Sequence, residues 1–371
     1  MASEISRVGL VFGGRSAEHR VSVDSAHTVA AALAEAGFEV VPLGIDPDGR
    51  WLPPEVSAPA LAGDIDELPA ATGSILSSIR HLVESGAQVL FPIVHGSWGE
   101  DGALQGLAEM LDLPYVGADV PASAVSMDKV LCKNVLEHAG VPVVEYRAFS
   151  RHQFEGDSAA WVAQLADVPL PLFVKPATGG SSVGVRKVAE RSQVADALAF
   201  AFRFSDRVLV ERGVQGRELE CAVLGHRQLR ASVIGEIVAG GDFYDYADKY
   251  LDGKAQLLAP ADLPSGLQEE LQALAIEAYA AVGGSGLARV DFLVEEAPDG
   301  THRCYVNEIN TLPGFTAISM YPRLWELSGI PRPDLVRHLV HHAQERHDDR
   351  RRLDQGIHEF LGELEARASK D

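Results

Sequence analysis

The stretch GLARVDFLVEEAPDGTHRCYVNEIN, residues 286–310, consists of two apolar segments joined by a short polar link. Side chains alternate across a strand, so Arg289 and Asp291 share one face of the first segment. By the same alternation, Glu308 and Asn310 share one face of the second segment. The link, EEAPDGTHR, contains the turn residues Pro, Asp and Gly. The stretch therefore predicts a β-hairpin that brings two carboxylates, an amide and a guanidinium to one patch.

This patch has two interpretations. Two carboxylates and an amide oxygen suit a hard cation such as Mg2+, and an arginine beside the cation suits phosphoryl transfer. Alternating acids are also typical of the solvated face of a strand. Here the acids interrupt otherwise apolar strands and lead into the turn TLPGFT, which favours the metal site.

The composition indicates a globular protein with room for two or three domains. The chain has 371 residues, of which 46% are hydrophobic and 23% charged. Its formal net charge of −21 argues against a nucleic-acid or anionic-membrane surface, because both need clustered cations. A phosphate ligand remains compatible with this charge, because local lysines and a metal ion can offset it.

Three widely spaced cysteines, Cys132, Cys221 and Cys304, suggest a reducing compartment and no disulfide framework or zinc site. We expect them to be small buried hydrophobic residues. The sequence shows no signal peptide and no apolar segment long enough to span a bilayer, so we expect a cytoplasmic protein.

The N-terminal third alternates strand-like and helix-like segments: VGLVF, SAHTVAAALAEAG, FEVVPLGI and AQVLFPIV. This alternation predicts an α/β domain with a Rossmann-like parallel sheet, whose loops form a crevice at the carboxyl ends of the strands. Residues 53–73 are rich in Pro, Ala and Gly and are expected to be irregular.

Further along the chain, helices are expected at 127–140, 190–202 and 268–282, and strands at 172–177, 207–212 and 218–225. The expected units are an N-terminal α/β domain (1–117), a central subdomain (118–210), a C-terminal subdomain with the metal hairpin (211–346) and an amphipathic helical tail (347–371). The tail is expected to dock on its own chain, with a dimer contact as the alternative.

Glycine-rich loops follow several strands. In KPATGGSSVG, Lys175 precedes backbone N–H groups and the hydroxyls of Ser181 and Ser182, which suits a phosphate, although an ordinary hairpin fits equally well. In HGSWGEDGALQG, His95 at a strand end is either structural or a ligand-binding residue. The loop GGRSAEHRVS lacks the G-x-G-x-x-G pattern, which excludes a dinucleotide fingerprint.

The segment 240–253, GDFYDYADKYLDG with its preceding glycine, combines several tyrosines with glycines at both ends. This composition fits a lid that closes over a site, or a surface loop packed by its own tyrosines.

Eight stretches together resemble one known family. They are GGRSAEH, HGSWGEDGALQG, SMDK, FVKPATGGSSVGV, GRELECAVLG, FYDYADKYLDG, GLARVDF and NEINTLPGFTAISMYP, between residue 13 and about residue 322. In this order they resemble the D-alanine–D-alanine ligases of the ATP-grasp superfamily. The resemblance implies an ATP-grasp fold and the ATP-dependent joining of two D-alanines through an acyl phosphate, for peptidoglycan precursors.

The resemblance also implies roles for particular residues. The metal site would hold two Mg2+ ions, with Mn2+ as a substitute, on Asp291, Glu308 and Asn310. ATP would contact Lys129, Lys175, Ser182, Glu211, Val214, Glu218 and Lys249. Catalysis would involve Glu18, Ser181, Tyr250, Arg289, Gly314 and Ser319, and the amino-acid substrates would also contact His95 and Leu312.

The sequence departs from the family at some positions. Arg20 stands where an acid is frequent, and Gly213 replaces a bulky residue in the expected adenine-binding hinge. The resemblance implies a homodimer. A related ligase for another D-amino acid or a D-hydroxy acid remains an alternative, as does a catalytically silent nucleotide-binding regulator.

Overall fold

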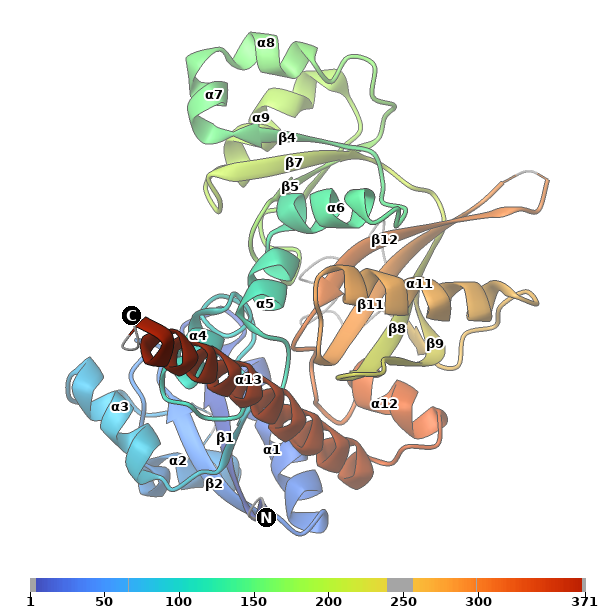
Figure 1. Ribbon diagram of the computed structural model, residues 1–371. Coiled ribbons are helices and arrows are strands. Elements are labelled where there is room, and N and C mark those ends of the chain that lie inside the picture. The colour runs from blue at the N-terminus through green and yellow to red at the C-terminus, as the bar shows by residue number, and fades with distance from the viewer. Residues whose placement is uncertain (1–4, 66, 239–255, 298, 369–371) are drawn as a thin grey trace.

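The computed structural model describes residues 5–65, 67–238, 256–297 and 299–368, and it contains three β-sheets with helices packed around them (Figure 1). Figure 1 shows the sheets in separate lobes, with the long helix α13 crossing in front of the N-terminal lobe. Within the described residues, no helix combines the length and the apolar character needed to cross a membrane.

The N-terminal sheet is parallel, with strand order β2-β1-β3. Its elements are β1 (Arg7–Gly13), α1 (His19–Glu35), β2 (Glu39–Ile45), α2 (Pro54–Leu61), α3 (Ile75–Glu84), β3 (Val89–Pro92) and α4 (Ala103–Met110). Strands β1 and β3 are neighbours, so the loops that follow them open at the same edge of the sheet. The predicted parallel α/β arrangement is confirmed.

Two local expectations in this lobe were wrong. Helix α1 begins at His19, six residues before the expected start at Ser25. A helix, α2, also occurs in the stretch expected to be irregular. It begins with Pro54, and proline is compatible with a first helical position because the N–H there has no intrahelical partner.

The central sheet is antiparallel, with order β4-β7-β5-β6. Its strands and helices are β4 (Tyr146–Ser150), α7 (Arg151–Gly156), α8 (Ser158–Ala163), β5 (Leu172–Pro176), β6 (Arg186–Val188), α9 (Val194–Ala201) and β7 (Arg207–Arg212), with a 3-10 turn at Arg191–Gln193. The helix expected over 127–140 is confirmed as α6 (Lys129–His138), and a further helix, α5 (Val120–Met127), precedes it. The two helices are separated by Asp128, whose side chain accepts hydrogen bonds from the N–H groups of Val130 and Leu131.

The third sheet is also antiparallel, with order β10-β9-β8-β11-β12. Its elements are β8 (Arg217–Gly225), β9 (Arg230–Val238), β10 (Gln256–Leu258), α11 (Leu267–Ala281), β11 (Gly286–Glu296), β12 (His302–Asn310) and α12 (Met320–Leu327). Strands β11 and β12 pair antiparallel, with Asp291 opposite Glu308 and Arg289 opposite Asn310. The predicted hairpin is therefore confirmed, and its register brings the four predicted side chains together in adjacent pairs.

Helix α13 (Arg332–Ala368) closes the fold. Its first half buries Leu335, Val336 and Leu339 against α1, α12 and the sheets. The expected tail helix is the continuation of this helix beyond the body of the protein.

Candidate active site

Two cavities adjoin where the three sheets meet. The first, of about 490 Å3, lies between the central and the third sheets, and the second, of about 740 Å3, lies beside the N-terminal lobe. Residues from separate parts of the chain line both cavities and form a common wall: Lys129, Gly179, Gly180, Ser181, Glu220, Ile237, Arg289 and Glu308. A group held at this wall is accessible from both sides.

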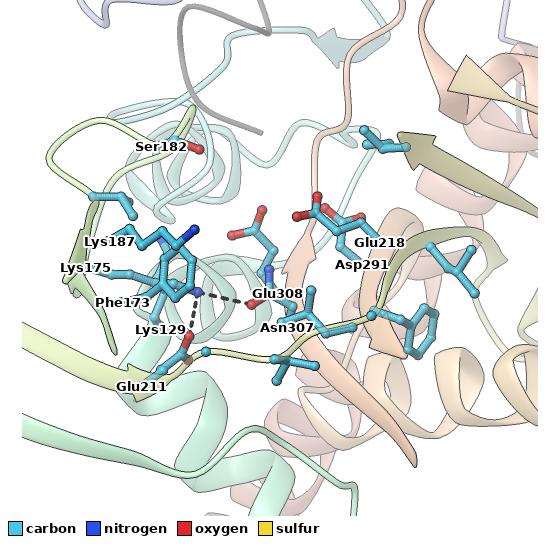
Figure 2. Close-up of a pocket in the computed structure, with 18 of the residues that line it drawn as sticks. Lys129, Phe173, Lys175, Ser182, Lys187, Glu211, Glu218, Asp291, Asn307 and Glu308 are labelled. Atoms are coloured by element: carbon cyan, nitrogen blue, oxygen red, sulfur yellow. Dashed lines mark hydrogen bonds and ion pairs between the residues drawn. The ribbon is translucent and has the colours of Figure 1, made fainter. Parts of the chain in front are cut away.

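In the first cavity, opposite charges face one another. Figure 2 shows Lys129, Lys175 and Lys187 on one side of the cavity and carboxylates of the third sheet on the other. Strands β5 and β6 supply two of these lysines, and the start of α6 supplies Lys129. A cavity with cations on one wall and carboxylates on the other suits a phosphate ligand that also carries metal ions.

Lys175 is held by two partners. Its Nζ lies 2.5 Å from Glu211 Oε2 and donates a hydrogen bond to Asn307 Oδ1 at 3.2 Å (Figure 2). Glu211 is buried, and its other oxygen lies 2.8 Å from the Nζ of the buried Lys133, in an ion pair rather than an aligned hydrogen bond. Burial alone raises the pKa of Glu211, but the two lysines outweigh it and lower that pKa to about 2. Glu211 is therefore ionised and holds Lys175 at the cavity.

Lys133 was not among the residues expected at the site. It lies four residues after Lys129 in α6, so the helical spacing placed the two side chains on neighbouring positions.

The acids predicted to bind a metal lie in a row across paired strands, and this row contains one acid more than expected. Strand pairing sets Asp291 between Glu308 on β12 and Glu220 on β8. Arg289 donates to both oxygens of Asp291, each at 2.7 Å, and its Nε lies 3.0 Å from Glu220. Glu220 was missed, although it alternates with Glu218 in RELECAVLG and so shares its face of the strand.

The donor set at this row fits a hard cation. Asp291 and Glu308 supply carboxylate oxygens, and Asn310 supplies an amide oxygen, which accepts a hydrogen bond from the Leu312 N–H at 3.0 Å. A carboxylate has about four acceptor positions, so the bidentate contact with Arg289 leaves Asp291 able to bind a cation as well. Within the described residues, no group of three or more His, Cys, Asp or Glu is arranged as a metal site, and the predicted set has only two such residues plus an amide.

The Ser- and Gly-rich loop after β5 has an unusual backbone. Ser181 and Ser182 both have positive φ, 52° and 57°, a conformation uncommon for residues other than glycine. Gly179, also at positive φ, presents its carbonyl to Lys129 Nζ at 2.7 Å. Such loops expose backbone N–H groups to anions, and this geometry favours the phosphate-binding interpretation over an ordinary hairpin.

The second cavity contains Glu18 and His95. The Ser181 hydroxyl donates a hydrogen bond to Glu18, so the loop after β5 reaches the crevice of the N-terminal lobe. His95 is buried, and its ring nitrogens contact the Leu312 carbonyl at 3.0 Å and Ser25 Oγ at 3.3 Å. Burial lowers the pKa of His95, and Arg289 acts in the same direction against Glu18, so the imidazole is neutral near pH 7.

The far end of the second cavity is formed by the segment before α12. Gly314, Thr316 and Ser319 line it. Ser319 Oγ accepts a hydrogen bond from the Thr316 N–H at 2.9 Å, which fixes the hydroxyl at the cavity wall. Leu312 is buried behind this wall and acts through its backbone, because its carbonyl contacts His95.

Glu100 is a further residue in the second cavity that was not singled out. Its Oε2 accepts a hydrogen bond from the Gly96 N–H at 2.5 Å. Burial, reinforced by Glu18, raises the pKa of Glu100 well above its ordinary value. The motif HGSWGEDG places this acid five residues after His95, and no local pattern distinguishes it from the neighbouring Asp101.

The two departures from the family have different consequences. A Cβ on Gly213 would lie 2.8 Å from Pro171 Cγ and 2.9 Å from the Pro171 carbonyl oxygen, so the hinge has no room for a side chain. Phe173 and Val214 line the first cavity at this hinge, and Phe173 supplies an aromatic ring there. Arg20 is exposed and lies outside both cavity linings, so solvent screens its charge from the site.

The structure brings the predicted residues together around the two cavities. Those that line only the first cavity are Lys175, Ser182, Glu211, Val214, Glu218 and Asp291, and those that line only the second are Glu18, His95, Asn310, Gly314 and Ser319. Four line both cavities: Lys129, Ser181, Arg289 and Glu308. Lys249 and Tyr250 lie outside the described residues.

Two antiparallel sheets, one bearing lysines and the other carboxylates, close on the first cavity, and a parallel α/β lobe lies beside them. This arrangement defines an ATP-grasp enzyme. The comparisons with known proteins narrow this class. Family models described as D-ala D-ala ligase N-terminus and D-ala D-ala ligase C-terminus match residues 7–118 and 135–341. The chain belongs to the D-alanine–D-alanine ligase family.

Individual relatives agree with the family models. The chain is 44% identical over 341 residues to a D-alanine–D-alanine ligase of Solibacter usitatus, covering 92% of this chain and 96% of the relative. It is 43% identical over 357 residues to D-alanine–D-alanine ligase A of Salmonella typhimurium, with the same coverage, 92% and 96%.

Solved structures show the same fold. The D-alanine–D-alanine ligase of Coxiella burnetii matches with a TM-score of 0.79 and 36% identity, over 97% of this chain and 99% of that one. The VanG D-Ala:D-Ser ligase of Enterococcus faecalis matches with a TM-score of 0.76 and 31% identity, over 92% and 100% of the two chains.

Proposed function

We propose that the protein joins two D-alanines to D-alanyl-D-alanine with conversion of ATP to ADP and phosphate, for peptidoglycan precursors. The observation that carries the proposal is the common wall of the two cavities. The cavity lined by lysines and carboxylates and the cavity beside Glu18 meet at Lys129, Arg289 and Glu308, where a phosphoryl group can pass from a nucleotide to a carboxylate.

The reaction has two steps. A carboxylate oxygen of the first D-alanine attacks the γ-phosphorus of ATP, the bond to the β-phosphate oxygen breaks, and an acyl phosphate and ADP form. The amine of the second D-alanine, after losing a proton, then attacks the acyl carbon. The tetrahedral intermediate expels phosphate and leaves the peptide bond.

The negative charge on the transferred phosphoryl group and on the tetrahedral intermediate must be stabilised by hydrogen-bond donors held in fixed positions. Arg289 and the Gly314 N–H are proposed for the intermediate, because Arg289 is anchored by Asp291 and Glu220 and cannot turn away. Lys129, Lys175 and the N–H groups around Ser182 are proposed for the nucleotide phosphates, together with Lys249. Glu218, Glu211 and Val214 are proposed for the ribose and adenine.

Asp291, Glu308 and Asn310 are proposed to hold two Mg2+ ions, which Mn2+ can replace. Bound there, the ions neutralise the nucleotide phosphates.

In the second cavity, Glu18 is proposed to hold the ammonium of the first D-alanine, with His95 beside it. Ser181, hydrogen-bonded to Glu18, and Tyr250 are proposed to connect the site to a lid, and Ser319 to hold the carboxylate of the second D-alanine. Exclusion of water there protects the acyl phosphate from hydrolysis.

We further propose the boundaries 1–117, 118–210, 211–346 and 347–371 for the structural units, a cytoplasmic location and a homodimer. The separate sheets of the first three units support this division, with β7 of the central sheet extending two residues past residue 210.

Phosphate release tests the proposal. The protein is mixed with Mg-ATP and D-alanine, and the product is identified by mass spectrometry, with L-alanine, D-lactate and D-serine as alternative substrates. We expect phosphate release that depends on D-alanine and equals the dipeptide formed. ATP binding without D-alanine-dependent phosphate release would contradict the proposal.

A further inference from the structure

The Ser- and Gly-rich loop after β5 holds two residues in a conformation that their side chains do not favour. Ser181 and Ser182 have φ of 52° and 57°, in the left-handed region. Such residues cost free energy and persist only where the surrounding structure fixes them. The hydrogen bond from Ser181 to Glu18 fixes the loop on the side of the second cavity. Further contacts fix it from outside both cavities.

These contacts come from the turn between α9 and β7, residues 203–207, here called the supporting turn. At the start of the loop, the Thr178 hydroxyl donates a hydrogen bond to Ser205 Oγ at 3.2 Å. At its end, the ring of Phe204 lies against Gly184, where an added Cβ would be only 2.6 Å from Phe204 Cδ2. Gly184 has a φ of 79°, which also favours glycine. The supporting turn therefore contacts the loop near both of its ends.

Phe204 is held in place by its neighbours on the surface. Its side chain is 44% exposed, so burial in the core does not fix the ring. The ring of Phe200 lies 5.3 Å away, edge to face, and the guanidinium of Arg203 lies over the Phe204 ring at 5.9 Å. Phe200 is itself covered by the guanidinium of Arg186 at 3.8 Å. Stacked aromatic and cationic groups thus hold the ring against the loop.

The supporting turn also fixes Lys129. The Arg207 carbonyl accepts a hydrogen bond from the Ala177 N–H at 2.9 Å, and the Ala177 carbonyl accepts one from the Lys129 N–H at 2.8 Å. The Arg207 guanidinium donates to Asp128, the residue that caps α6. Lys129 Nζ in turn donates to the carbonyl of Gly179 in the loop at 2.7 Å. One turn therefore holds both the loop and the lysine beside it.

We propose that the supporting turn positions the phosphate-binding groups of the first cavity from outside, with Phe204 as the main positioning residue. Phe204, Ser205 and Arg207 lie outside both cavity linings, and they act through the loop and Lys129, which line the first cavity. A loop that is already in its binding conformation loses less free energy on binding. The inference rests on the proposed binding of nucleotide phosphates and not on the joining of D-alanines.

Ligands with and without phosphates test this role in the full chain by calorimetry. Phe204→Ala is expected to bind Mg-ADP about tenfold more weakly than the unaltered chain, because binding must then itself hold the two serines at positive φ. Adenosine is expected to bind both chains equally, because it has no phosphate to contact the loop. General damage to the fold would weaken both ligands alike.

Two further variants separate the ring from its position on the surface. Phe204→Tyr keeps the ring against Gly184 and is expected to bind Mg-ADP as the unaltered chain does. The control Phe360→Ala removes a ring that is 59% exposed on α13, outside both cavity linings. It is expected to leave the binding of both ligands unchanged.

Gly184→Ala tests the same contact without removal of the ring. The new Cβ displaces Phe204, and we expect weaker binding of Mg-ADP with unchanged binding of adenosine. In the double variant Gly184→Ala/Phe204→Ala there is no ring left to displace. The second substitution should therefore weaken binding less than it does alone, because residues in contact are not additive.

Three results would overturn the proposal. One is a Phe204→Ala chain that binds Mg-ADP as tightly as the unaltered chain, or that loses Mg-ADP and adenosine in equal proportion. Another is full additivity in the double variant. The third is an unaltered chain that binds Mg-ADP no more tightly than adenosine. Failure of the ligase reaction is a separate outcome, because it appears as absent D-alanine-dependent phosphate release, and the binding comparison contains no D-alanine.

Discussion

At the scale of single residues, Glu211 shows how burial and ion pairing together determine the charge state of a residue at the site. A buried carboxylate is tolerated only when its charge is compensated, and here Lys133 and Lys175 both face it. Lys133 is needed as a second partner of Glu211 because Lys175 also lines the first cavity. Lys133 therefore keeps Glu211 ionised while Lys175 makes its proposed contact with a phosphate.

The variant Lys133→Met tests this pairing. Removing one partner of a buried ion pair leaves an uncompensated charge, and we expect a loss of about 3–5 kcal/mol in the free energy of unfolding at pH 7, measured in urea. The matched control Lys187→Met changes an exposed lysine and is expected to change stability by less than about 0.5 kcal/mol. A loss below about 1 kcal/mol for Lys133→Met would contradict the assigned role.

The same pair predicts a pH dependence. Because the pKa of Glu211 is about 2 in the folded protein and lies above 4 in the unfolded chain, its stabilising contribution is complete at neutral pH and is lost as the pH falls toward 2. The stability difference between the unaltered protein and Lys133→Met should therefore shrink on acidification from pH 5 to pH 3. A constant difference across this range would show that Glu211 is not the group involved.

Gly213 tests the packing of the hinge. In Gly213→Ala the new Cβ meets Pro171, and we expect a loss of about 1–3 kcal/mol in stability with a higher KM for ATP. Gly156→Ala is the control, because a Cβ there meets nothing within 4 Å. Equal stability of the two variants would mean that Pro171 can move away.

At the scale of secondary-structure elements, the pairing of β8, β11 and β12 aligns Glu220, Asp291 and Glu308. Glu220 contacts Arg289 without being one of the proposed metal ligands. It is therefore a positioning residue, which orients the guanidinium that the proposed mechanism uses.

In Glu220→Gln one charged partner of Arg289 is lost while the side-chain size is kept. A hydrogen bond to a charged group contributes about 1.5–3 kcal/mol, so we expect kcat to fall about 10- to 100-fold with a smaller change in the KM for D-alanine. Glu326→Gln is the control, because Glu326 pairs with Arg332 at 2.9 Å outside both cavities. Unchanged kcat in Glu220→Gln would remove it from the site.

Helix α13 offers a comparison within one element. Leu339 is fully buried, and Leu339→Ala should cost about 2–5 kcal/mol in unfolding free energy. Leu353 is 72% exposed, and Leu353→Ala should cost less than about 0.5 kcal/mol at protein concentrations too low for self-association. Similar costs for the two variants at low concentration would show that the second half of the helix is packed within one chain.

Elements with strong local signals were predictable, and long-range pairings were not. The hairpin could be placed from its alternating pattern because Arg289, Asp291, Glu308 and Asn310 lie on strands adjacent in sequence. The pairing of Asp291 with Glu220 could not, because it joins residues 71 positions apart, and no local pattern encodes that register. Helix α2 was missed because its prolines suggested a loop, although Pro54 at a first helical position is compatible with a helix.

At the scale of the whole molecule, each cavity is lined by residues of more than one lobe. A ligand that binds there contacts several lobes at once, so binding should stabilise the entire fold. We expect Mg-ATP at 100 times its Kd to add about 2.7 kcal/mol to the free energy of unfolding, seen as a higher Tm.

Addition of EDTA to the same sample tests the metal contribution. Chelation of Mg2+ should remove most of the Tm increase, because the proposed ligands Asp291, Glu308 and Asn310 then face the phosphates with no cation between them. An identical increase with and without EDTA would contradict the proposed metal site. The Tm reports the unfolding of the protein and not the formation of product, so the measurement is independent of the ligase reaction.

The common wall of the two cavities also constrains how the protein can change. Any substitution of Lys129, Glu220, Arg289 or Glu308 alters the surroundings of both substrates at once. Variation that shifts the choice of amino acid without weakening nucleotide binding is therefore confined to residues facing the second cavity alone, such as Thr316 and Ile318. New specificities for the second amino acid should therefore arise from substitutions at residues that face only the second cavity. An inhibitor that occupies both cavities should select resistance mutations only at the expense of turnover.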